Sequence, residues 1–205
     1  GVVMTDGYAA YEALRNLLLQ KQGYTYELVS CWTHVRRRFV KCEADYPQAG
    51  EVLALIGKLY EIESRAREGP FENPLDALRH VAKRRDEESR PVVAEIQAWR
   101  SRQHYLPSSS LGTAVTYMDG LWLRLIKFLD DPRVMLDNNG SERAMRGPVL
   151  GRKNHYGSRS QTGTEVAALF YSLVETCKLV GMSPREYLTE AARRALLCKG
   201  TVTLP

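Results

Sequence analysis

Long apolar runs are absent from this sequence. No segment reaches 18 consecutive apolar residues, which excludes an ordinary membrane-spanning helix. There is also no initiator methionine and no basic-then-apolar leader, because the chain opens on GVVMTDGY. This opening has the apolar pattern of a strand, so we expect the chain to be a fragment that begins inside a folded domain.

Cysteine is scarce and scattered. No C-x-x-C pair occurs, and each cysteine lies in an apolar or helical context, so reduced thiols in a cytoplasmic protein are the simplest interpretation. Cys31 and His34 have the spacing of a metal-ligand pair, but no second pair completes a zinc site, and zinc is the weaker hypothesis. The four cysteines are Cys31, Cys42, Cys177 and Cys198.

Positive charge is unevenly distributed along the chain, whose net charge is +5. Residues 45–133 contain 13 basic and 14 acidic residues, whereas the rest of the chain contains 16 basic and 10 acidic residues. A concentrated basic surface favours binding of a polyanion, nucleic acid first of all. The basic residues form two groups in the sequence, and each group by itself is also explained by an ordinary solvated helix face. The two groups are Arg36, Arg37, Arg38 and Lys41, and then Arg143, Arg146, Arg152, Lys153 and Arg159.

The first 44 residues have the pattern of strand, helix, strand and helix. Residues 2–4 are an apolar run that ends at a Thr-Asp-Gly turn, and residues 8–20 follow with helical apolar spacing. Residues 26–30 form a second apolar run, and residues 31–43 a second helix that carries the three arginines. Short links between such elements are typical of a parallel sheet.

From Pro47 the pattern is wholly helical. Asn73 and Pro74 have the order of an N-cap and a first helical residue, and Pro91 interrupts the helix that they open. We predict that this near-neutral block, residues 45–133, is an α-helical insertion without catalytic residues, between core segments 1–44 and 134–205. The apolar spacing predicts its helices around residues 52–59, 74–90, 92–99 and 111–129.

The last segment is polar and basic at its start. Asn138 or Asn139 is expected to cap a short helix that ends before Pro148, and the stretch GRKNHYGSRSQTG is expected to be a loop. Two closing helices are expected after it. Each opens with a capping box, Thr162 with Glu165 and Ser183 with Glu186.

Two acidic residues are candidates for a catalytic pair. Asp6 follows a predicted parallel strand, where functional groups gather in α/β sheets, and Glu142 lies in the first turn of a helix beside Arg143 and Arg146. Each also has an ordinary structural interpretation. Aspartate before glycine often forms a turn, and glutamate in a first helical turn favours the helix dipole.

A series of motifs in fixed order changes the balance between these interpretations. The chain contains TDGYAAY, CWTHVRRRF, DNNGSERAMR, GRKNHYGS and YSLVETCKLVG-x-SPREYL. This series resembles the transposases of the insertion-sequence sixty-six family, from Thr5 to about Leu188. In the middle helical block the resemblance is one of pattern more than of letters.

The resemblance implies an α/β fold, predominantly helical overall. It would be a ribonuclease-H-like core of which this chain holds the last two strands and flanking helices, interrupted by the helical insertion. It also implies a catalytic trio of two aspartates and one glutamate. Asp6 matches the second aspartate and Glu142 the glutamate, while the first aspartate would lie upstream, so this chain alone is expected to be inactive.

The implied activity is metal-dependent strand cleavage and strand transfer at transposon ends. Two Mg²⁺ or Mn²⁺ ions would be held by carboxylates that include Asp6 and Glu142, because such ions prefer hard oxygen ligands. The implied partners are transposon-end DNA and target DNA, with a homodimer as the complete assembly in the bacterial cytoplasm. Two alternatives remain open at this point: an inactive DNA-binding remnant and a helical interaction module.

Basic residues near the acidic pair are the predicted contacts to the DNA backbone. Three consecutive arginines on a helix cannot all face one way. Tyr8, Tyr11, His155 and Tyr156 are candidates for stacking on bases, with core packing favoured for Tyr11. The roles of His34, Asn138 and Asn139 stay open, with turn formation favoured for the asparagines. The predicted DNA contacts are Arg146, Arg152, Lys153 and Arg159, followed by Arg36, Arg37 and Arg38.

Overall fold

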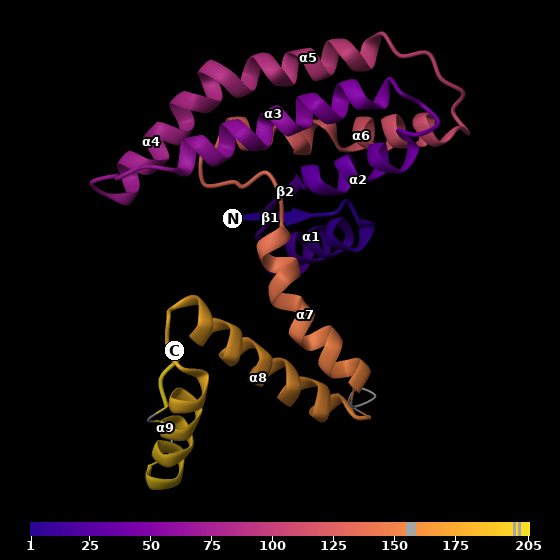
Figure 1. Ribbon diagram of the computed structural model, residues 1–205. Coiled ribbons are helices and arrows are strands. Elements are labelled where there is room, and N and C mark those ends of the chain that lie inside the picture. The colour runs from indigo at the N-terminus through magenta and orange to yellow at the C-terminus, as the bar shows by residue number, and fades with distance from the viewer. Residues whose placement is uncertain (155–158, 199, 201) are drawn as a thin grey trace. The chain divides into compact units, whose positions relative to one another are not determined.

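A computed structural model describes residues 1–154, 159–198, 200 and 202–205. These residues are mostly helical and fold into two compact units, Gly1–Asn138 and Asn139–Pro205, which we describe separately (Figure 1). No helix in the described part of the chain combines the length and the apolar content that a membrane crossing needs.

The first unit contains a small parallel sheet. Strand β1 (Val2–Thr5) pairs with β2 (Glu27–Ser30), in a register that sets Val2 opposite Glu27 and Thr5 opposite Ser30. Helix α1 (Ala9–Gln22) connects the two strands, and α2 (Trp32–Cys42) follows β2. The strand–helix–strand–helix prediction for the first 44 residues is confirmed.

The remaining helices of this unit form a layer with α2. Residues 85–89 are a π-helical stretch that joins α4 to α5, so Pro91 stands in the first turn of α5. Asn73 caps α4 through its side chain, which accepts hydrogen bonds from the amides of Leu75 and Asp76. The elements are α3 (Ala49–Arg67), α4 (Pro74–Arg84), η1 (Arg85–Ser89), α5 (Arg90–Ser101), α6 (Ser110–Leu125) and η2 (Ile126–Leu129).

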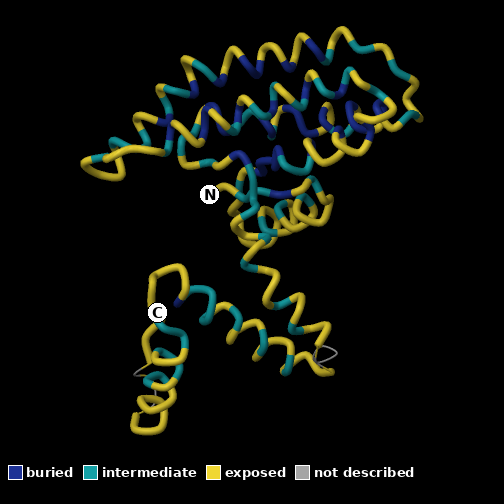
Figure 2. Tube along the Cα trace, in the orientation of Figure 1, coloured by how far each residue is buried: buried dark blue, intermediate teal, exposed yellow. Residues whose placement is uncertain are grey.

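The core of the first unit lies between α2, α3, α5 and α6 (Figure 2). Helix α6 also packs on β2, and the indole of Trp32 donates to the carbonyl of Leu125 at 3.0 Å. Residues 1–44 and 45–133 therefore share one core. The largest fully buried side chains are Trp32, Trp99, Arg85, Phe39, Phe128, Ile56, Leu59, Ile96, Leu111, Met118, Leu125 and Val29.

Helix α1 is less covered than the sequence suggests. Tyr11, for which core packing was expected, is 41% exposed, and α1 has no buried residue. A two-stranded sheet is too narrow to cover the apolar stripe of a 14-residue helix. The expectation for Tyr11 was therefore wrong, and its carbonyl accepts a hydrogen bond from the hydroxyl of Tyr26 at 2.8 Å.

In the second unit the described residues form helices α7 (Asn139–Asn154), α8 (Gln161–Leu179) and α9 (Pro184–Leu197). Most of its residues are exposed or half-buried, as Figure 2 shows, while Cys177 of α8 is buried. Helix α8 packs against both α7 and α9. Ser183 caps α9 by accepting a hydrogen bond from the amide of Glu186, as predicted.

Two predicted boundaries in this unit are wrong. Helix α7 continues through Pro148 to Asn154, so the residues 151–154 expected in a loop are helical. Gly147 precedes the proline, and a glycine removes the Cβ clash that normally makes the residue before proline leave the helix. The N-cap of α8 is Ser160, whose Oγ accepts from the amide of Gly163 at 3.0 Å, and Thr162 lies inside the helix.

Trp122→Ala is expected to lower the free energy of unfolding by about 3 kcal/mol. The indole is 8% exposed, packs edge-on against Trp32 with ring centroids 6.2 Å apart, and lies 4.7 Å from the guanidinium of Arg100. Because its rim reaches the surface, the loss is at the lower end of the range for tryptophan. Urea unfolding measures the loss, with Leu123→Ala, 74% exposed on the same helix, as the control. Equal effects of the two substitutions would contradict this prediction.

Candidate functional site

Asp6 is exposed directly after β1, at the carboxyl end of the parallel sheet. Its Oδ1 accepts a hydrogen bond from the amide of Tyr8 at 3.0 Å, while the Oγ1 of Thr5 accepts from the amide of Gly7 at 3.2 Å. These bonds close the turn that the sequence predicted. They present the Asp6 carboxylate at the end of the strand.

The turn around Asp6 is seated on helix α6. Gly7 has a φ of 89°, and a Cβ at this position would lie 3.0 Å from the Cδ2 atom of Leu121. The backbone conformation therefore favours glycine, and a Cβ would in addition displace the end of the Leu121 side chain slightly. The hydroxyl of Tyr117, one turn earlier on α6, donates a hydrogen bond to the backbone carbonyl of Asp6. A helix of the segment 45–133 thus holds the predicted catalytic aspartate in place.

A cleft of about 660 Å³ lies beside Asp6, between α2 and α6. The wall of the cleft that α2 forms is strongly basic. His34, Arg37, Arg38 and Lys41 line it, and their spacing of i, i+3, i+4 and i+7 puts them on one face of the helix. Among the described residues that line the cleft, Asp6 alone is acidic. The lining residues are Asp6, His34, Arg37, Arg38, Lys41, Ser108, Ser110, Thr113, Ala114 and Tyr117.

Arg38 and Tyr117 contact each other across the cleft. The Arg38 guanidinium lies over the Tyr117 ring, 3.8 Å from its centroid. Burial raises the pKa of the Tyr117 hydroxyl, and Arg38 opposes part of that rise. The hydroxyl therefore remains protonated at neutral pH and donates to the Asp6 carbonyl.

The three consecutive arginines separate in the way that helix geometry requires. Arg37 and Arg38 line the cleft, whereas Arg36 is exposed and lies outside it. His34, whose role the sequence left open, and Lys41 join the cleft from the same helix. Their spacing was visible in the sequence, but no pattern pointed to Tyr117, which is 111 residues from Asp6.

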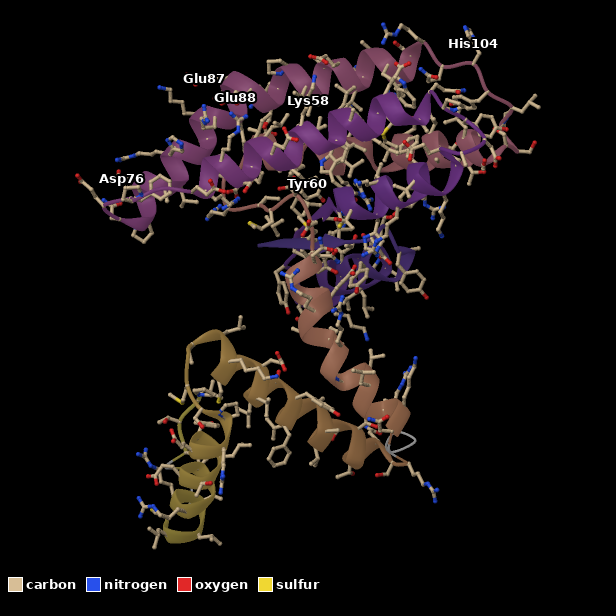
Figure 3. The ribbon with its side chains drawn as sticks, in the orientation of Figure 1. Lys58, Tyr60, Asp76, Glu87, Glu88 and His104 are labelled. Atoms are coloured by element: carbon tan, nitrogen blue, oxygen red, sulfur yellow. The ribbon has the colours of Figure 1, made fainter. Side chains whose placement is uncertain are left out.

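The chain leaves the first unit close to the end of β2. The carbonyl of Leu136 accepts a hydrogen bond from the amide of Trp32 at 2.9 Å. The Oγ1 of Thr33 donates to the Asp137 carboxylate at 3.3 Å and lies 2.8 Å from the hydroxyl of Tyr60. Figure 3 shows Tyr60 on the side of α3 that faces the sheet. These bonds anchor Leu136 and Asp137 at the start of α2. Helix α2 begins just after β2, the strand that pairs with the strand preceding Asp6.

Glu142 lies half-buried in the first turn of α7, in the second unit. Arg146 and Lys153 are exposed four and eleven residues later, on the same face of the helix, and Arg152 lies about 80° away around the axis. Arg159 is exposed just before α8. The pairing of Glu142 with Asp6, which belongs to the other unit, stays a prediction.

Some expectations gain no support from the structure. His155 and Tyr156 lie outside the described residues, and Tyr8 is 67% exposed. Cys31 is buried, and no group of three or more His, Cys, Asp or Glu side chains suited to a metal occurs among residues 1–154, 159–198, 200 and 202–205.

Comparison with known families decides the class of protein. The family model described as "Transposase IS66 family" matches residues 1–166, which include both Asp6 and Glu142. The chain belongs to this transposase family. The resemblance inferred from the motifs is therefore confirmed.

Relatives in Sinorhizobium fredii extend over the whole chain. The uncharacterized protein y4jD is 29% identical over 208 residues, which cover all of this chain and 39% of the relative. The uncharacterized protein y4hP is 28% identical over 210 residues, which cover 95% of this chain and 36% of the relative. This chain thus spans less than two fifths of the length of these two relatives. No solved structure matches the chain significantly.

Proposed function

We propose that this chain is the part of a DNA transposase that carries two of its three catalytic carboxylates. The complete enzyme would cleave and transfer DNA strands at transposon ends, with a divalent metal, as a homodimer that pairs two ends with target DNA. One observation carries the proposal: in a transposase-family chain, Asp6 stands exposed at the end of a parallel strand, on the rim of a basic cleft.

The first unit supports a ribonuclease-H-like interpretation of the core. Parallel strands with functional residues at their carboxyl ends are the arrangement that the resemblance implies. Leu136 and Asp137 are anchored at the start of α2, directly after β2, and Glu142 follows Asp137 by five residues. A short link between this anchored segment and Glu142 is what the proposed pairing of Glu142 with Asp6 requires.

Mg²⁺ or Mn²⁺ fits the donors that the chain offers. The Asp6 carboxylate is exposed, and carboxylate oxygens are the ligands that these ions prefer. Asp6 and Glu142 would hold two ions together with the aspartate expected upstream. When bound, the ions would activate the attacking oxygen and stabilise the leaving oxygen of an in-line displacement at phosphorus.

Basic residues of both units have a separate task, which is to hold the DNA backbone. Arg37 and Arg38 would bind phosphate in the cleft, and Arg36 would add to the positive field on the same helix. In the second unit this role falls to Arg146, Arg152, Lys153 and Arg159.

Arg152→Ala combined with Lys153→Ala is expected to reduce the salt dependence of DNA binding. Each lost phosphate contact should lower the slope of log K against log salt by about 0.9. Fluorescence anisotropy with a labelled duplex measures the slope. The matched control is Arg193→Ala with Arg194→Ala, an adjacent pair bound to Glu190 at 2.8 and 2.7 Å. An absence of binding at low salt, or identical slopes for both pairs, would overturn this assignment.

A further inference from the structure

The cleft beside Asp6 has walls from two different parts of the chain. Helix α2 supplies the basic wall, and α6 supplies Ser110, Thr113 and Tyr117. The sequence predicted that the segment containing α6, residues 45–133, carries no catalytic residue. The cleft gives this segment a role in the site, because α6 lines the cleft opposite the basic residues of α2.

The lining of the cleft selects the chemistry of its ligand. Guanidinium and ammonium groups on one wall and hydroxyl donors on the other suit an anion with several acceptor oxygens. The volume of about 660 Å³ exceeds the need of a lone phosphate and leaves room for the adjoining sugars. A phosphodiester of a DNA strand matches both the charge and the size.

Tyr117 connects this cleft to Asp6. Its ring lies under the Arg38 guanidinium at 3.8 Å, while its hydroxyl donates to the Asp6 carbonyl. The cation–ring contact limits the freedom of a long side chain. One residue thus sets the position of a cation relative to the strand end that carries the carboxylate.

We propose that the cleft between α2 and α6 binds one phosphodiester of the substrate strand through Arg37, Arg38 and Lys41, and that Tyr117 is a positioning residue. Tyr117 holds Arg38 and Asp6 in a fixed relation, so that a phosphate bound in the cleft sets the next phosphate against the carboxylate. This inference rests on the proposed transposase function, and it assigns a substrate-binding role to the helical segment.

The first experiment compares neighbouring arginines in DNA binding by the 205-residue chain. Arg38→Gln and Arg37→Gln should each weaken binding of a labelled duplex several-fold and reduce the salt slope by about 0.9. Arg36→Gln removes the same charge one residue away, outside the cleft, and should reduce binding and the slope clearly less than either cleft variant, because Arg36 adds only to the positive field. Equal losses from Arg36→Gln and Arg38→Gln would show that the cleft is not the phosphate site.

The second experiment tests the coupling through Tyr117. Tyr117→Leu should weaken binding about as much as Arg38→Gln, and the double variant should bind no more weakly than either single variant. Tyr117→Phe keeps the ring and should bind within about twofold of wild type, which also keeps the test valid if the leucine variant fails to fold. Losses that multiply in the double variant, or a Tyr117→Phe variant that binds as poorly as Arg38→Gln, would overturn the positioning role.

A kinetic measurement separates this proposal from the proposed function. In the complete, cleaving protein, Tyr117→Phe should lower kcat about tenfold at unchanged KM, because the Asp6 carbonyl loses its donor while the phosphate site remains. Tyr105→Phe, a half-buried tyrosine of the same segment, is the control. If the wild-type protein cleaves no DNA, the proposed function fails while the binding comparison still decides on the cleft. If Tyr117→Phe cleaves like wild type, the positioning role fails and the function stands.

Discussion

Asp6→Asn or Glu142→Gln should each reduce DNA strand cleavage at least about a hundredfold, a loss of about 2.7 kcal/mol of transition-state stabilisation. Either change replaces a charged oxygen ligand with a neutral amide, at positions proposed to hold the two metal ions. DNA binding should persist or tighten slightly, because negative charge is removed near phosphate. The assay is cleavage of transposon-end DNA with Mg²⁺ or Mn²⁺.

The form of the protein used in this assay matters. The resemblance puts the first aspartate upstream of Asp6, so activity is expected in a protein extended to include that aspartate. The 205-residue chain alone should bind DNA without cutting it. Activity of the short chain equal to that of the extended protein would show that the upstream carboxylate is not needed.

Two conservative substitutions serve as matched controls. Asp45→Asn changes an exposed aspartate just after α2, and Glu165→Gln changes a glutamate in the first turns of α8. Both should leave cleavage within about twofold of wild type, as surface changes usually do. If Asp6→Asn or Glu142→Gln cleaves as fast as these controls, that residue is not a metal ligand and the proposed site is wrong.

Arg85→Ala should lower the free energy of unfolding by about 5 kcal/mol, the upper end of the range for removing one partner of a buried ion pair. Arg85 is fully buried and belongs to the π-helical turn η1, which directs both Arg85 and Ser89 inward. Its Nε and one terminal nitrogen donate to the Glu63 carboxylate at 3.0 and 2.5 Å.

The remaining donors of Arg85 explain why the loss should be so large. They bind the backbone carbonyls of Phe128, Asp131 and Val134, the last two at 2.9 and 2.8 Å. All five N–H groups of the guanidinium are therefore used, and no other side chain offers five donors in that plane. Arg85→Ala would leave three buried or half-buried carbonyls and one carboxylate without these partners, each of which costs free energy.

Urea unfolding with an unchanged m-value measures this effect. Arg84→Ala is the matched control, because Arg84 precedes Arg85 on the chain and pairs with Glu88 at the surface, where such pairs contribute about 0–1 kcal/mol. Arg85→Lys should retain less than half of the stabilisation, since an ammonium cannot reach both the carboxylate and the carbonyls. A loss below about 1 kcal/mol for Arg85→Ala would show that the cluster does not stabilise this segment.

The Arg85 cluster also bears on the candidate site. It holds residues 128–134, the segment that leads to Asp137 and then to Glu142. Arg67 reinforces it by binding Glu63 and the carbonyl of Pro132 at 3.2 Å. A stable path for this segment supports the position of Leu136 and Asp137 at the start of α2.

Local patterns in the sequence were sufficient for the elements whose signals are local. The apolar runs at residues 2–4 and 26–30, the Asp6-Gly7 turn and the Asn73 cap are all found where they were predicted, because each depends on neighbouring residues only. The motifs around Asp6 and Glu142 were equally sufficient for the family. The spacing of His34, Arg37, Arg38 and Lys41 also marks one face of α2, although the sequence does not say what that face meets.

Tertiary structure decided the rest, because the deciding contacts join residues far apart in the chain. Tyr11 stays at the surface where a wider sheet would bury it. Arg85 is buried because the Glu63 carboxylate and three backbone carbonyls accept hydrogen bonds from its guanidinium. No local sequence pattern predicts this cluster. Tyr117 reaches Asp6 and Arg38 only because α6 packs on the sheet. The wall of the cleft that α6 forms therefore depends on the tertiary structure and could not be predicted from any one segment of the sequence.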